Sequence, residues 1–297
     1  MAAPDPEVVV VGAGFAGLTG ALVLGRSQRR VLVLGSGPTR NAEAEHAHNV
    51  LTREATPPGE LLRLGRAEVA ALPSVTLADA EVTAVESADD VRWGVRTADG
   101  ERVEAPAVLL ATGARDTLPD VAGLAALWGR RAHSCPFCDA DPYAGRRLLA
   151  LADEAKAAHS RALLAGWTDQ VTVVDPAAVT SIAERDGEVV AALADGTRVA
   201  ADGVFVGVTP VPRLGPVAAL PLARRGPFLA VDGQQRTGLP GLWAAGDCSW
   251  RDGDASPGGQ VVAAMAAGSR AAIAIVFDRL GVAVPDAPPV TATVPSP

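Results

Sequence analysis

Two cysteines separated by two residues, Cys135 and Cys138, are the side chains in this sequence best suited to redox chemistry. At this spacing two thiols can close a small ring and cycle between dithiol and disulfide. A helix that begins near the pair would lower the pKa of a thiol through its positive end. A structural disulfide or half of a zinc site has little support, because there is no second Cys-x-x-Cys and metal ligands are scarce. We therefore predict a redox-active pair and no bound metal.

Two glycine-containing segments on either side of the dithiol indicate a flavin dinucleotide. The first, at residues 12–17, follows the buried strand Val8–Val11 and opens an apolar helical run, which is the order of a dinucleotide-binding unit. Its glycines let the backbone approach a pyrophosphate, whose charge the helix N-terminus stabilises. The second is Gly-Leu-Trp-Ala-Ala-Gly-Asp at residues 241–247, a further flavin signature. Together they predict that the chain binds FAD.

Composition narrows the class of protein. The 297 residues are 48% hydrophobic and 20% charged, as in ordinary globular proteins. A net charge of −8 makes nucleic acid an unsuitable partner. No signal-peptide layout precedes the first strand, and we see no apolar run close to the roughly 20 residues that span a bilayer. These features predict a cytoplasmic protein without a membrane segment.

The order of buried strands and helices predicts an α/β fold with two Rossmann-like, three-layer domains. Residues 1–115 and 223–297 would form an FAD-binding domain, and residues 116–222 a reduced nicotinamide-type domain that carries the dithiol. A proline-rich stretch at residues 285–297 is expected to be a loose tail. Besides Val8–Val11, the expected elements are the strands Val31–Leu34, Ala107–Ala111, Leu148–Leu151, Val171–Val174 and residues 203–208, β-structure over Val75–Val85, Val91–Val103 and residues 189–199, and the helices Leu61–Leu72, Glu154–Leu164 and Gln260–Leu280.

Taken together, these motifs resemble the low-molecular-weight thioredoxin reductases over nearly the whole chain. The shared segments are the first glycine loop, Ala-Thr-Gly-Ala at 111–114, the dithiol followed by Asp139, Ala-Ala-Gly-Asp at 244–247 and residues 260–268. A closer resemblance is to a branch of that family, the gliotoxin- and holomycin-type dithiol oxidases. It is carried by residues 40–41, 46–48 and 56–58 and by the proline after the first cysteine.

The resemblance implies a division of roles. Cys138 would face the flavin and Cys135 the substrate, while Asp139 would move protons, although a helix-capping role is the alternative. His48 would contact the flavin, Asp247 would accept from a ribityl hydroxyl, and a homodimer is expected. The cofactor-binding residues predicted in all are Gly12, Gly14, Phe15, Ala16, Gly17, Ser36, Arg40, Asn41, His48, Val82, Ala111, Thr112, Gly113, Gly246, Asp247, Gln260 and Val261.

Departures from the reductase pattern bear on the electron donor. The strand Leu148–Leu151 runs into Ala-Asp-Glu, where a nicotinamide-binding domain would have a glycine cradle, and two carboxylates there would repel phosphate. Asp175 and Pro176 stand where a basic run would hold a 2′-phosphate, and the middle domain looks shortened over residues 179–186. The second strand ends in Gly35 where an acid usually holds ribose, so Ser36 or backbone groups would have to substitute.

The predicted function is that of an FAD-dependent dithiol oxidase. It would form an intramolecular disulfide in a small-molecule dithiol, pass the electrons to molecular oxygen and give hydrogen peroxide, in antibiotic or other natural-product biosynthesis. One alternative is a disulfide reductase with a non-nicotinamide donor such as ferredoxin, and another is a non-catalytic flavoprotein redox sensor. His133 would either stabilise a thiolate or pack locally, Trp250 would line a cleft or pack on the surface, and Cys248 is expected to be a small buried residue.

Overall fold

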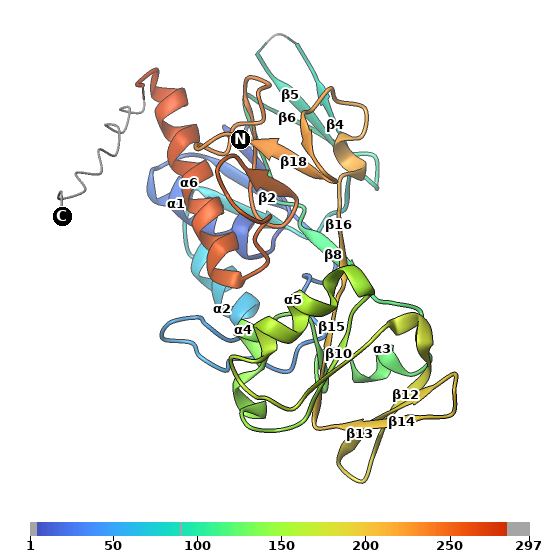
Figure 1. Cartoon of the computed structure of the whole chain (residues 1–297). Helices are drawn as coiled ribbons and strands as arrows, with labels where there is room; N and C mark the ends of the chain where they lie inside the picture. Colours follow the sequence, from blue (N-terminus) through green and yellow to red (C-terminus); the bar gives the residue numbers. More distant parts are fainter. Residues whose placement is uncertain (1–4, 90, 284–297) are drawn as a thin grey trace, which may run out of the picture.

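The computed structural model describes residues 5–89 and 91–283, so the expected tail at 285–297 lies outside the described residues. Figure 1 shows two α/β units, one above the other, joined by a pair of strands. The upper unit combines the N-terminal and C-terminal parts of the chain, and the lower unit is built from the middle of the sequence. The predicted fold class, α/β with two Rossmann-like units, is confirmed.

The sheet of the upper unit has five parallel strands in the order β19, β7, β1, β2, β3. These strands are β1 (Val8–Val11), β2 (Val31–Leu34), β3 (Val75–Ala78), β7 (Ala107–Leu110) and β19 (Leu242–Ala244). Every residue of β1 and β7 is buried, as aliphatic side chains in the middle of a parallel sheet should be. The register brings the carboxyl ends of β1, β2 and β7 to one edge.

Helices α1 (Phe15–Arg26) and α6 (Val261–Leu280) cover one face of this sheet, with α2 (Pro58–Ala70) beside α1. A Cβ on Gly268 would lie 2.0 Å from the carbonyl oxygen of Ala16, so α1 and α6 touch backbone to backbone. The expectation about apolar runs is wrong, because an 18-residue window of α6 has a mean hydropathy of 1.6 and the helix is long enough to cross a membrane. Its buried residues Ala271, Ala272 and Ile275 belong to the core formed with α1, and a core helix meets the same criterion.

The opposite face of the sheet is covered by β-structure. The strands are β4 (Val82–Ser87), β5 (Trp93–Thr97) and β6 (Arg102–Ala105) in one antiparallel sheet, and β17 (Arg224–Arg225), β18 (Phe228–Val231) and β20 (Ser249–Arg251) in another small sheet, with the 3₁₀ turn η3 (Gly215–Val217) nearby. Cys248 is fully buried in the core between these layers, as predicted. Trp250 stacks edge-on against Phe228 and lies beneath the Arg225 guanidinium.

The lower unit repeats the parallel arrangement with one strand fewer. Its four-stranded sheet has the order β11 (Val171–Val174), β10 (Leu148–Leu151), β15 (Gly203–Val206), β9 (Ala132–His133). Around it lie the helices α3 (Leu124–Leu127), α4 (Pro136–Asp139) and α5 (Glu154–Leu164), the 3₁₀ turns η1 (Asp141–Tyr143) and η2 (Pro176–Ala178), and the antiparallel strands β12 (Val179–Arg185), β13 (Glu188–Leu193) and β14 (Arg198–Ala201). The unit is therefore a three-layer fold with a reduced helical layer.

The two units are joined by β8 (Ala114–Thr117) and β16 (Thr209–Pro212), which pair antiparallel and run between the units in Figure 1. Neither strand was predicted. β8 includes the predicted domain boundary at residue 115, and β16 ends before the predicted return at residue 223. The exact division of the chain into domains stays a prediction.

Candidate functional site

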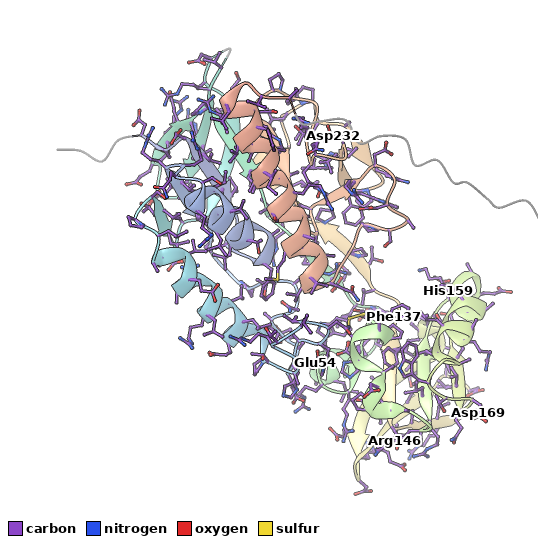
Figure 2. All side chains as sticks on the ribbon, turned by 90° about the vertical axis from the view of Figure 1, so that its left-hand side faces the viewer. Glu54, Phe137, Arg146, His159, Asp169 and Asp232 are labelled. Atoms are coloured by element: carbon purple, nitrogen blue, oxygen red, sulfur yellow. A yellow bond between two sulfur atoms is a disulfide. The ribbon has the colours of Figure 1, made fainter. Side chains whose placement is uncertain are left out.

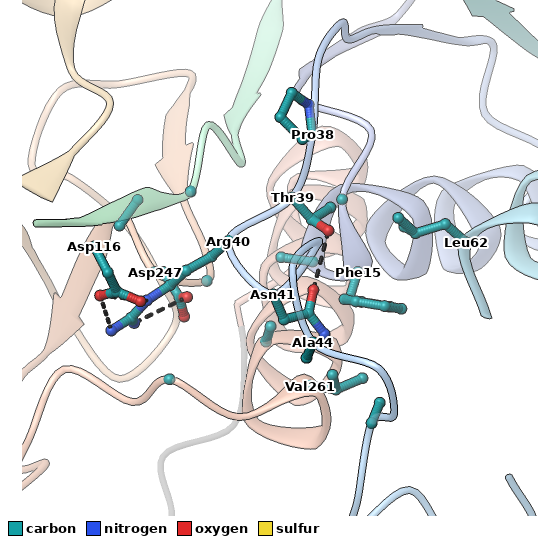
Figure 3. Close-up of a pocket in the computed structure, with 18 of the residues that line it drawn as sticks. Phe15, Pro38, Thr39, Arg40, Asn41, Ala44, Leu62, Asp116, Asp247 and Val261 are labelled. Carbon is teal, nitrogen blue, oxygen red and sulfur yellow. Dashed lines mark hydrogen bonds and ion pairs between the residues drawn. The ribbon is translucent and has the colours of Figure 1, made fainter. Parts of the chain in front are cut away.

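One cavity of about 480 Å³ lies at the carboxyl edge of the upper sheet and reaches the dithiol of the lower unit. Figure 3 shows part of its lining. Most residues predicted to bind the cofactor line it: Gly12, Gly14, Phe15, Ala16, Ser36, Arg40, Asn41, His48, Ala111, Thr112, Gly113, Gly246, Asp247, Gln260 and Val261. Cys135, Cys138 and Asp139 line the same cavity, so the structure brings the dithiol and the two glycine segments together.

Two predicted cofactor residues lie outside this lining. A Cβ on Gly17 would lie 1.9 Å from the carbonyl oxygen of Gly12, so Gly17 shapes the glycine loop by allowing that close approach. Val82 begins β4, and its buried side chain packs in the core on the far face of the sheet. The glycine motif at 12–17 thus contributes both lining and internal packing.

The cavity fits a dinucleotide at the first glycine loop. Gly12 has a φ of +114°, and a Cβ there would lie 2.2 Å from the carbonyl oxygen of Ala111. A Cβ on Gly14 would meet only Thr39, at 3.6 Å, so the backbone is open to a close ligand. The N-terminus of α1, at the cavity, has no side-chain cap from the described residues, which leaves its N–H groups for a pyrophosphate. The buried Thr112 hydroxyl also has no hydrogen-bond partner among the described residues and lines the cavity.

Arg40 joins three distant parts of the chain inside the cavity. Its guanidinium donates to Asp116 of β8 through Nε, at 3.0 Å, and Nη2, at 2.7 Å, and to Asp247 through Nη1 at 3.2 Å (Figure 3). Burial raises the pKa of the Asp247 carboxyl, and the Arg40 cation opposes that rise. Arg213, at the end of β16, donates to the carbonyl oxygen of Pro38 at 2.9 Å. The loop at residues 36–41 is therefore bonded to both connecting strands.

Cys135 and Cys138 form a disulfide at the start of α4. Cys135 is the N-cap residue, and its carbonyl oxygen accepts from the backbone N–H groups of Cys138 and Asp139, both at 3.1 Å. Phe137, between the cysteines, is 63% exposed and packs edge-on against Trp167. Within residues 5–89 and 91–283, no cluster of three or more acidic, histidine or cysteine side chains is arranged for a metal ion.

A histidine, an acid and a tyrosine form a small network beside the disulfide. His133 Nδ1 lies 3.6 Å from Asp139 Oδ1, and His133 Nε2 lies 3.3 Å from the Tyr143 hydroxyl. Burial raises the pKa of Asp139 to about 6 and lowers the pKa of His133 to about 4. Near neutral pH, Asp139 is therefore largely ionised and His133 is neutral. Tyr143 lies four residues after Asp139 and is the only tyrosine in the chain, but no motif in the sequence predicted its place beside the dithiol.

The loop at residues 46–56 packs against the turn of the dithiol. Asn49 Nδ2 donates to the carbonyl oxygen of Phe137 at 2.9 Å, and Figure 2 shows Glu54 and Phe137 where this loop meets the lower unit. Glu54 lies 2.6 Å from His48 Nδ1 and accepts from the Asn49 backbone at 2.8 Å. Because Glu54 holds Nδ1, the other ring nitrogen of His48 is left for a ligand in the cavity. Glu54 gave no motif signal in the sequence.

At the nicotinamide-type position of the lower unit, two acids of the chain cap the helix N-termini. After β10, Asp153 is the N-cap of α5, and its carboxylate accepts from the Lys156 backbone at 3.0 Å and pairs with Lys156 Nζ at 3.0 Å. The helix N-terminus that would bind a phosphate in a Rossmann unit therefore already holds an anion. Asp175, after β11, caps η2 in the same way by accepting from Ala177 at 2.8 Å.

Comparison with known proteins defines the class. The family model described as pyridine nucleotide-disulphide oxidoreductase matches residues 6–142 and 143–268. The chain belongs to this family, and its fold is thioredoxin reductase-like.

Two curated relatives and one solved structure are similar to this chain. The thioredoxin reductase sirT of Leptosphaeria maculans is 36% identical over 134 residues, which cover 44% of this chain and 41% of sirT. The thioredoxin reductase aclD of Aspergillus oryzae is 34% identical over 140 residues, which cover 46% of this chain and 44% of aclD. The match thus spans less than half of the length of these relatives. The crystal structure of HlmI superposes with a TM-score of 0.85 and 32% identity over 93% of each chain.

Proposed function

We propose that the protein is an FAD-dependent dithiol oxidase that closes a disulfide in a small-molecule dithiol and uses molecular oxygen as the electron acceptor. The observation that carries the proposal is the pairing of an oxidised dithiol in the flavin-type cavity with a nicotinamide position capped by Asp153. Electrons would then enter from a dithiol substrate and not from a nicotinamide. The resemblance at residues 40–41, 46–48 and 56–58 supports natural-product dithiols as the substrate class.

The thiol chemistry uses the disulfide directly. A substrate thiolate attacks Cys135 Sγ, the Cys135–Cys138 bond breaks, and Cys138 leaves as a thiolate. The second substrate thiolate then attacks the substrate sulfur of the mixed disulfide, which releases the cyclic disulfide and a Cys135 thiolate. When bound in the cavity, FAD would supply the chemistry that moves the electron pair of the enzyme dithiol to oxygen. The overall balance is one dithiol and one O₂ giving one disulfide and one H₂O₂.

Two groups are placed to take the substrate protons. His48, held through Nδ1 by Glu54, would accept a thiol proton at its other ring nitrogen on the loop side of the cavity. Asp139 lies directly after Cys138 and, with a pKa raised to about 6, would accept or return a proton near neutral pH. His133 Nδ1 lies 3.6 Å from this carboxylate, and the other ring nitrogen of His133 lies 3.3 Å from the Tyr143 hydroxyl.

The test is oxygen uptake by the purified protein with a dithiol such as dithiothreitol and no nicotinamide. We expect one equivalent of hydrogen peroxide per disulfide formed. Cys135→Ser and Cys138→Ser should each abolish uptake, whereas Cys248→Ser, which changes a buried cysteine outside the cavity lining, should leave it largely intact. No uptake by the flavin-loaded protein, or equal uptake by the Cys138→Ser variant, would refute the proposal.

A disulfide reductase with another electron donor is the second candidate. It is favoured by the names of the sirT and aclD relatives, both thioredoxin reductases. The two candidates differ in the direction of electron flow. If this candidate is correct, anaerobic protein reduced by a ferredoxin-type donor would reduce an added disulfide. The protein would then take up no oxygen when it is given a dithiol.

A further inference from the structure

The second strand of the upper sheet lacks the acid that normally accepts hydrogen bonds from a dinucleotide ribose. β2 ends at Leu34, and Gly35 follows at the edge of the cavity. A Cβ on Gly35 would lie 2.4 Å from the backbone nitrogen of Ala13 and 2.7 Å from its Cβ. The glycine loop therefore fills the space that a side chain at position 35 would need, and the acid must come from elsewhere.

The neighbouring strand β3 is followed by a carboxylate that lies beside Gly35. β3 runs parallel to β2 with Leu34 opposite Ala78, and the Gly35 backbone N–H donates to the Ala78 carbonyl oxygen at 3.2 Å. Asp79, the next residue, is therefore beside Gly35 at the carboxyl edge, and both line the cavity. Arg66 of α2 also lines the cavity and donates through Nη2 to Asp79 Oδ1 at 2.6 Å.

We propose that Asp79, oriented by Arg66, replaces the missing acid and binds the adenosine ribose of FAD. The inference rests on the FAD binding of the proposed function. Asp79 Oδ2 has no hydrogen bond to any described residue, and the side chain is 77% exposed, so it is free to accept from the ribose hydroxyls. The Arg66 cation offsets the repulsion between this carboxylate and the nearby pyrophosphate. Ser36 also lines this region, but its single hydroxyl is a weaker acceptor than a carboxylate.

The experiment is a fluorescence titration of the apoprotein with FAD. Asp79→Asn should weaken FAD binding by about tenfold to a hundredfold, since it removes charge-assisted hydrogen bonds to the ribose. A weaker affinity would point to lost hydrogen bonds, because loss of a negative charge alone should strengthen the binding of an anionic cofactor. Arg66→Gln should cause a smaller loss, and the double variant should bind about as weakly as Asp79→Asn alone.

The controls separate the possible outcomes. Glu81→Gln removes the same charge two residues away at an exposed position outside the cavity, and it should bind FAD within about twofold of wild type. The Asp79→Asn apoprotein should have the same melting temperature as the wild-type apoprotein, because an exposed ion pair contributes little stability. Wild-type affinity in Asp79→Asn, or a loss confined to Ser36→Ala, would overturn the inference. If the wild-type chain itself does not bind FAD, the proposed function fails first, and that result is distinguishable from a defect in one variant.

Discussion

Replacing Asp139 with asparagine should make the protein more stable at neutral pH while it impairs dithiol oxidation. Burial raises the pKa of this carboxyl from its ordinary 3.8 to about 6, a change that corresponds to about 3 kcal/mol. Its side chain is only 21% exposed, so solvent screens the effect little. The ionised form present at pH 7 therefore destabilises the fold, and asparagine keeps the shape without the charge.

The pH dependence of this effect has a defined sign. Between pH 4 and 6, folded Asp139 holds a proton that the unfolded chain has lost, so this residue makes stability fall as pH rises. His133 acts in the opposite direction, because its pKa is lowered from 6.5 to about 4 and the unfolded chain binds the extra proton. The two effects nearly cancel in the wild type over this range. Asp139→Asn should leave only the histidine effect, so its stability should rise by about 1.4 kcal/mol per pH unit.

The measurement is urea unfolding, with the disulfide intact, at pH 4, 5, 6 and 8. Asp139→Asn should match the wild type at pH 4 and exceed it by up to about 3 kcal/mol at pH 8. The matched control Asp141→Asn changes an exposed acid two residues away and should stay within about 0.5 kcal/mol. Equal or lower stability of Asp139→Asn at pH 8 would show that burial does not raise the pKa of this group.

Three further predictions concern the nicotinamide-type position, the dithiol and the oligomeric state. NADPH and NADH should not reduce the flavin at useful rates, because Asp153 caps the helix that would bind the phosphate; bleaching within a second in anaerobic stopped-flow mixing would contradict this. Cys135→Ser should show a long-wavelength charge-transfer band that fades as pH falls and Cys138 protonates, whereas Cys138→Ser should show none; a band in the second variant alone would reverse the two roles. The protein should be a homodimer by light scattering, and a mass near 30.1 kDa at micromolar concentration would count against it.

Strong local patterns were enough to predict the frame that positions the site. The helix Glu154–Leu164 and the strands Leu148–Leu151 and Val171–Val174 have the bounds expected from sequence, because apolar runs and an acidic N-cap signal mark them locally. The connecting strands β8 and β16 were missed, since Ala-Arg-Asp-Thr and Thr-Pro-Val-Pro carry charges and prolines that disfavour a strand prediction. β12 was missed because the segment was interpreted as a shortened region.

Contacts between distant residues set the limit of sequence reasoning at the site. The backbone segments that line the cavity could be predicted, because each glycine motif is recognised by the spacing of glycines within one short segment. The Arg40 bonds to Asp116 and Asp247 span 76 and 207 residues, and no local pattern encodes such partners. The proposed role of Asp79 also could not be predicted from a local pattern. It depends on the register of β3 beside β2 and on the space that the glycine loop fills at Gly35.

The network beside the disulfide is better explained by chemistry than by folding. If Asp139 served only to cap a four-residue helix, asparagine would cap it as well, and the raised pKa of the buried carboxyl would make asparagine the more stable residue at neutral pH. Asp139 has no side-chain hydrogen bond to the described backbone that would make it such a cap, and Cys135 already occupies the N-cap position. Burial also disfavours the protonated form of the neighbouring His133 and lowers its pKa. Two groups whose pKa values are displaced in opposite directions, next to a disulfide in a cofactor-sized cavity, form a pair suited to proton exchange with thiols.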